Sequence, residues 1–97
     1  MLIFKDLEFF KTFSGVGATH TFDNNITISV QAGSFHYSTP RGNFALPSSF
    51  VSFEVAIIDE EGEFITKDFI TSDGNGVIGW QDRADISILM IKIQFDK

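Results

Sequence analysis

Apolar and polar residues alternate along the middle of the chain with the period of two that is typical of a half-buried β-strand. The alternation is clear at residues 26–32 and clearest at residues 51–57. Residues 19–22 are rich in β-branched side chains, which favour strands. Residues 64–70 are a further short apolar segment. We therefore expect an antiparallel sheet in which residues 51–57 and 64–70 are neighbours joined by a tight turn.

Segments rich in glycine, asparagine and proline separate these predicted strands. Residues 14–17 and 23–25 predict a break and a turn, and residues 72–76 predict another turn. The one long loop is residues 37–49, where two prolines and a glycine disfavour a regular element. Loops of this length in a small domain are often functional. Residues 1–13 fit a short amphipathic helix and a strand almost equally well.

The last segment, residues 83–95, fits two periods. Apolar residues at positions 86, 89, 90 and 93 have helical spacing, whereas the many β-branched side chains and the alternation from 89 to 95 suit a strand. Asp82 is a good N-cap, with Asp85 three residues later in the position of a capping-box partner. This start signal favours the helix.

These segments predict one domain, residues 1–97, of the α+β class. An antiparallel sheet of four to five strands is expected, with the C-terminal helix on one face. If residues 83–95 form a strand instead, the alternative is a small all-β sandwich or barrel. The predicted core consists of Ile26, Ile28, Val30, Val51, Phe53, Val55, Ile57, Phe69, Leu89 and Ile93.

Phenylalanine is unusually abundant, with twelve in 97 residues. Most of them are expected in the core, but so many also suggest that some lie on a surface that faces a partner. Trp80 lies between two apolar segments and is expected to be buried. Tyr37 and Arg41 share the long loop, and both are residue types enriched at binding hot spots.

Charge and composition exclude several classes of function. The net charge is −6 and the basic residues are scattered, so we expect no direct nucleic-acid binding. No cysteine is present, which excludes thiolate chemistry and disulfides. Charged residues interrupt the apolar N-terminal segment, which argues against a signal peptide, and no stretch is long enough for a membrane span. We expect a cytoplasmic protein without membrane contact.

Acidic residues cluster in and around the segment Asp59-Glu60-Glu61-Gly62-Glu63, here called the acidic turn. Gly62 can supply the positive φ that a hairpin loop needs. The turn is too compact for a calcium loop, and carboxylates on an exposed tip lack the contacts that catalysis needs. We predict instead a negative edge that docks on a basic partner, with Glu54 and Asp68 as further members.

Known catalytic and cofactor-binding motifs are absent from the sequence. The sequence has no nucleophile elbow, zinc-protease motif or phosphate loop. His20 and His36 lie on separate predicted strands. Asp73-Gly74-Asn75-Gly76 begins like a calcium loop, but no acid follows before Asp82. We therefore predict no enzyme activity, no cofactor and no metal.

Four segments of the chain, taken together, resemble the layout of a known group of proteins. They are the strand ITISVQ, the Tyr-Ser-x-Pro-Arg loop at residues 37–41, the strand FEVAI with its acidic glycine turn, and VIGW followed by a capped segment. From residue 26 to about residue 90 this layout resembles that of some small tailed-phage proteins. The resemblance implies a phage setting and a helix after Trp80, and it brings no catalytic residues.

Three functions are compatible with the sequence. The favoured one is a protein-binding module, such as a phage accessory protein that binds or inhibits a host protein. Its acidic surface could imitate nucleic-acid phosphates, and its partner would carry a basic surface. The alternative is a structural or virion protein that assembles into a homo-oligomer. A small enzyme is the third, and it would need a deep pocket with perturbed titratable groups.

Overall fold

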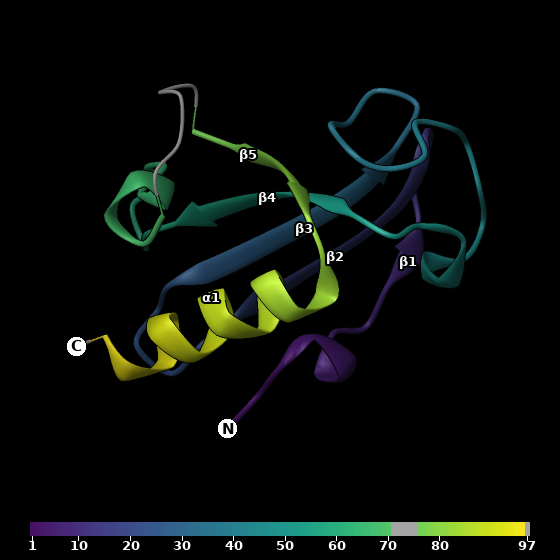
Figure 1. The fold of residues 1–97 in the computed structure, drawn as a ribbon. Coiled ribbons are helices and arrows are strands. Elements are labelled where there is room, and N and C mark those ends of the chain that lie inside the picture. The colour runs from purple at the N-terminus through teal and green to yellow at the C-terminus, as the bar shows by residue number, and fades with distance from the viewer. Residues whose placement is uncertain (71–75, 97) are drawn as a thin grey trace.

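A computed structural model describes residues 1–70 and 76–96 of the chain. Five antiparallel strands form one sheet in the order β1-β2-β3-β4-β5, with one α-helix across one face (Figure 1). This confirms the predicted α+β class. The elements in chain order are η1 (Phe4–Asp6), β1 (Phe10–Lys11), β2 (Gly15–Thr21), β3 (Thr27–Gly33), η2 (Pro47–Ser49), β4 (Phe53–Ile58), η3 (Thr66–Asp68), β5 (Ile78–Gln81) and α1 (Arg83–Phe95).

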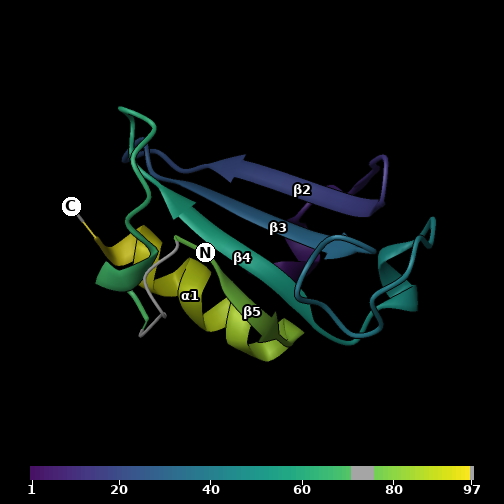
Figure 2. The ribbon, with the colours of Figure 1, turned by 90° about the horizontal axis from the view of Figure 1, so that it is seen from above.

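The two faces of the sheet differ because successive side chains point to opposite sides of each strand. On one face, Val30 of β3 pairs with Ala18 of β2 and Val55 of β4, and all three are buried. On the other face, the next residue, Gln31, pairs with Glu54. Only the apolar face is covered by α1, as the view from above shows (Figure 2).

Helix α1 begins where the sequence signal predicts. The Asp82 carboxylate accepts a hydrogen bond from the Asp85 amide at 2.8 Å, and the Asp85 carboxylate accepts one from the Asp82 amide at 3.0 Å. The two residues thus form a capping box, and the all-β alternative is excluded. The helix contributes four side chains to the core, namely Ile86, Leu89, Met90 and Ile93.

The N-terminal segment contains both a short 3₁₀ helix and a short strand. The Phe4 amide donates a hydrogen bond to Ser87 Oγ on α1 at 3.0 Å. The Phe4 and Phe9 rings pack on Phe53, with centroids 5.2 and 5.7 Å away. The segment therefore closes one edge of the core, where apolar burial stabilises it.

Two members of the predicted core differ from the rest. Phe69 is half-buried and packs against the core, whereas Val51 is 62% exposed. Val51 was predicted from an alternation that begins two residues before β4 does. Its amide donates to the Thr39 carbonyl at 2.8 Å, and the next side chain, Ser52, is buried instead. Residues 51 and 52 pair irregularly with Thr39 of the long loop. As a result, the side chain of Ser52, and not that of Val51, lies on the buried side.

The predicted strand at residues 64–70 is wrong. Phe64 makes an isolated bridge with Ile58, and the chain then turns into η3, so the edge partner of β4 is β5. The buried Thr66 hydroxyl accepts from the Ile57 amide at 2.9 Å and donates to the Gly76 carbonyl at 2.7 Å. A side chain thus satisfies an edge group of β4 that a strand was expected to satisfy. Apart from Gly76, the predicted turn at residues 72–76 lies outside the described residues.

The predicted break at residues 14–17 is also wrong, because β2 begins at Gly15. Gly15 pairs with Gly33 of β3, and the two backbones lie very close together. A Cβ atom on Gly15 would lie 2.0 Å from the Ala32 carbonyl oxygen. Glycine is present here to permit close strand packing, not to end a strand.

Candidate functional site

The acidic turn is a compact loop at the end of β4. The Asp59 Oδ1 atom accepts hydrogen bonds from the Glu61 amide at 3.0 Å and the Glu63 amide at 2.9 Å. Gly62 has φ +84°, as the sequence predicts for this position. The side chains of Glu60, Glu61 and Glu63 are exposed. Asp59 therefore builds the turn, and the three glutamates carry its outward charge.

The other two acids predicted for this edge differ in position. Asp68 is exposed in η3, which follows the turn. Glu54 lies near the start of β4, away from the turn at its end, and is half-buried. Its Oε1 atom lies 3.0 Å from His36 Nδ1, and its Oε2 atom accepts from the Tyr37 amide at 3.1 Å. Glu54 thus anchors the long loop and is not part of a continuous acidic edge.

His36 lies in the turn after β3 and not on a strand, contrary to the prediction. The chain leaves the sheet after Gly33, at the end of β3, so His36 lies outside the strand. His20 lies within β2, and different elements therefore position the two histidines. In the part of the chain that the structure describes, no group of three or more histidine or carboxylate side chains could hold a metal ion.

Tyr37 and Arg41, predicted together from the long loop, do lie together, and Trp80 joins them. The Tyr37 and Trp80 ring centroids are 5.2 Å apart, and the Arg41 guanidinium carbon lies 5.4 Å from the Tyr37 centroid. The Trp80 amide donates to the Tyr37 carbonyl at 2.9 Å. The three side chains form an exposed stack with a cation–π contact.

The prediction that Trp80 is buried is wrong, since it is 58% exposed. The cause is an irregularity in β5. Phe53 and Val55 of β4 pair with Gln81 and Ile78, so β5 has one residue more than β4 across this interval. Trp80 has φ +54°, which is unusual for a bulky residue. This bulge directs the indole away from the core and onto Tyr37.

Two phenylalanines at the same end of the sheet are even more exposed. Phe13 precedes β2 and is 90% exposed, and Phe35 follows β3 and is 72% exposed. Their rings are almost parallel, with an interplanar angle of 2° and centroids 6.5 Å apart. We call this region the aromatic end, and it consists of Phe13, Phe35, Tyr37, Arg41 and Trp80. The phenylalanine count was the only sequence signal for the exposure of Phe13 and Phe35.

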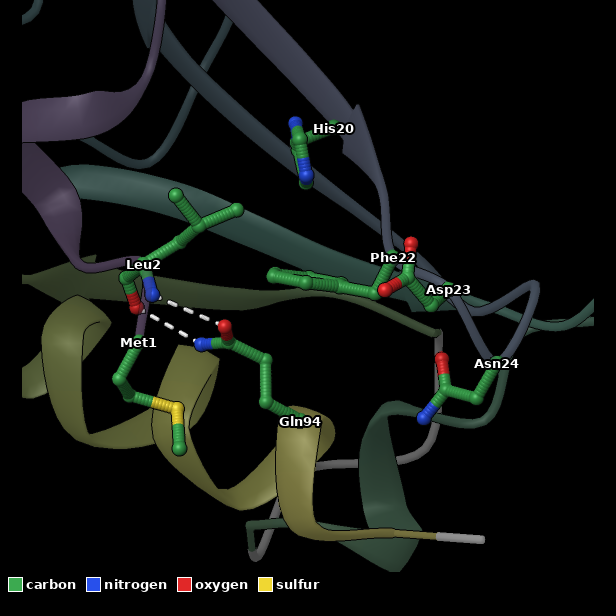
Figure 3. A pocket seen from close by; sticks show the side chains of 7 residues that line it. All are labelled: Met1, Leu2, His20, Phe22, Asp23, Asn24 and Gln94. Atoms are coloured by element: carbon green, nitrogen blue, oxygen red, sulfur yellow. Dashed lines mark hydrogen bonds between the residues drawn. The ribbon is translucent and has the colours of Figure 1, made fainter.

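A pocket of about 370 Å³ lies between the N-terminal segment, the end of β2 with the turn that follows it, and α1 (Figure 3). Its Gln94 side chain donates to the Leu2 carbonyl at 2.7 Å and accepts from the Leu2 amide at 2.9 Å. The Asn24 amide group donates to the carbonyls of Ile93 and Asp96. Both side chains thus bind backbone groups. The lining residues are Met1, Leu2, His20, Phe22, Asp23, Asn24 and Gln94.

Comparison of the chain with known protein families, with curated proteins and with solved structures finds no match. Among residues 1–70 and 76–96, no helix is long and apolar enough to cross a membrane.

Proposed function

We propose that this protein is a non-catalytic protein-binding module. The observation that carries the proposal is the exposed stack of Tyr37, Arg41 and Trp80 at one end of the sheet. Tryptophan, tyrosine and arginine are the residue types that most often dominate binding energy at protein interfaces. Exposed aromatic groups of this kind mark interaction surfaces on small soluble domains.

The conformation of Trp80 adds to this argument. A bulky residue with positive φ costs folding free energy, and such strain is found mainly at functional sites. Burial does not compensate for it here, because the indole is mostly exposed. Contact with a partner would bury the ring and would account for its outward orientation.

The acidic turn is proposed as a second docking surface, one that suits a basic partner. Glu60, Glu61 and Glu63 project from a rigid turn and are exposed. Such a cluster accelerates encounter with a basic surface and makes the association sensitive to salt. The resemblance to tailed-phage proteins supports a phage accessory protein that binds a bacterial protein in this way.

A second candidate function is that of a structural protein that assembles with itself. It is favoured by the location of cationic and aromatic side chains at one end of the sheet and acidic side chains at the other. A small enzyme is less well supported, because two polar residues of the pocket, Asn24 and Gln94, are occupied by backbone groups.

The proposal is tested by capturing partners from a bacterial lysate with three tagged variants beside the wild type. The first carries Arg41→Glu and Trp80→Ala, and the second carries Glu60→Lys and Glu61→Lys. The control carries Glu8→Lys and Asp96→Lys, which changes the net charge as much as the second variant does. A protein held by the wild type and the control, and lost from either surface variant, supports the proposal. Equal capture by all four forms would contradict it.

A further inference from the structure

The cationic groups around the aromatic end are not neutralised by carboxylates. Within the described residues, the ion pair present is His36–Glu54, and it includes neither Arg41 nor Lys11. Lys11 Nζ donates to the Asn43 side chain at 2.7 Å and to the Thr12 carbonyl at 2.6 Å, both neutral acceptors. Arg41 packs its guanidinium over Tyr37, which leaves the planar group available for a carboxylate.

The carboxylates at this end of the sheet are each held by groups other than Arg41. Glu54 contacts His36 and the Tyr37 amide, as described above. Asp82 and Asp85 begin α1 and accept hydrogen bonds from each other's backbone amides. Their charges lie against the positive N-terminal end of the helix dipole. The guanidinium of Arg41 is therefore the cation best placed to contact an external carboxylate.

The acidic turn offers the complementary chemistry. Glu60, Glu61 and Glu63 are exposed, and the next residue, Phe64, is 55% exposed. The segment thus presents carboxylates beside an aromatic ring. A surface made of an arginine and two aromatic rings is suited to such a segment, because charge pairing and ring packing can occur together.

These two surfaces cannot meet within one molecule. β4 runs from Phe53, beside the Glu54–Tyr37 contact, to Ile58, just before the acidic turn. Six residues of extended chain span roughly 20 Å. The long loop and the acidic turn lie at opposite ends of the sheet (Figure 1). Only a second copy can bring its acidic turn to the aromatic end of the first.

We propose that copies of this protein associate head to tail, with the acidic turn and Phe64 of one copy bound to Arg41, Tyr37 and Trp80 of the next. This assembly rests on the second proposed function and names its interface. Because the two surfaces differ, the contact is heterologous, and it produces open chains or closed rings rather than a symmetric dimer.

Sedimentation velocity over a wide range of protein concentrations tests the assembly. The mean mass of the wild type is expected to rise with concentration and to fall at high salt, since the contact is partly electrostatic. Arg41→Ala with Trp80→Ala blocks one surface without adding a negative charge, and Glu60→Lys with Glu61→Lys blocks the other. Each variant alone is expected to remain monomeric, with affinity at least about tenfold weaker than that of the wild type.

The decisive sample is an equimolar mixture of the two blocked variants. One retains its acidic turn and the other its aromatic end, so they are expected to form a 1:1 dimer that grows no further. Monomers in the mixture, a monomeric wild type, or assembly of either variant alone would overturn the inference. Circular dichroism and urea unfolding first establish that both variants are folded.

Glu8→Lys with Asp96→Lys is the control, and it is expected to assemble as the wild type does. A failure of head-to-tail assembly leaves the first proposed function open to its own test. If the wild type is monomeric but lysate capture still depends on Arg41 and Trp80, the self-assembly inference is wrong and the binding-module proposal stands.

Discussion

The two ends of the sheet differ in what their polar and exposed residues contribute to the fold. At the acidic turn, local hydrogen bonds account for the structure, because Asp59 binds two amides of its own loop and Thr66 binds the edge of β4. At the aromatic end, Trp80 and Phe13 are exposed without any comparable role in the fold. Charge on a turn is expected of a folded chain, whereas exposed aromatic stacks need a further reason.

We expect the stability of the aromatic end to depend on the buried side chain of Phe53 beneath it and not on its exposed rings. Phe53 is fully buried and contacts Phe4, Phe9 and Phe50. Phe53→Ala should lower the free energy of unfolding by roughly 3–5 kcal/mol, measured by urea denaturation. Phe13→Ala, which removes a ring that is 90% exposed, is the matched control and should have little effect. Equal losses would mean that the exposed stack is structural.

At the end of the sheet that carries the acidic turn, we expect substitution of Thr66 to lower the free energy of unfolding most. Thr66→Val keeps the shape of the side chain but leaves the Ile57 amide and the Gly76 carbonyl without their partner. The free energy of unfolding should fall by about 1–3 kcal/mol, the usual cost of unsatisfied buried polar groups. Thr66→Ser, which retains the hydroxyl, should lose less. A neutral Thr66→Val would show that η3 is held by packing alone.

A smaller effect is expected within the acidic turn itself. Asp59→Ala removes the acceptor of two backbone amides and should cost about 1 kcal/mol, by analogy with the loss of a helix N-cap. Glu61→Ala should leave the urea midpoint unchanged, because the side chain is exposed. If Asp59→Ala and Glu61→Ala behave alike, the division between a turn-building acid and outward-facing acids is incorrect.

The smallest change in stability is expected at Trp80, where a partner-binding role is most clearly separated from folding. Asparagine tolerates positive φ better than tryptophan, so Trp80→Asn relieves strain while it removes the contact with Tyr37. The free energy of unfolding should change by less than ~0.5 kcal/mol in either direction. A loss of several times that amount would indicate that the indole supports the fold.

The parts of the fold that depend on local chemistry were predicted from the sequence. The strand at β3 follows from its alternating residues, and the start of α1 follows from Asp82 and Asp85. The turn at Gly62 follows from the need for positive φ. Each signal lies within a few residues, so neighbouring elements were not needed to interpret it.

The site was only partly predicted. Tyr37 and Arg41 were recognised from their residue types, and the acidic turn was recognised from its charge. Trp80 was expected in the core because apolar segments flank it, and Glu54 was grouped with the wrong acids. Both errors arise where the long loop meets the sheet, at β5 for Trp80 and at β4 for Glu54. These contacts join segments that are well separated in the chain, so no local pattern encodes them.

The architecture, one sheet with a capped helix, is specified by local sequence, because periodicity and capping act over short stretches of chain. Which aromatic residues are exposed depends instead on how the elements pack in space. That outcome depends on the bulge in β5, on the pairing of β4 with β5 instead of residues 64–70, and on the limited area that one helix can cover. Burial is a property of neighbouring elements in space, so it is not specified by a residue's own position in the chain.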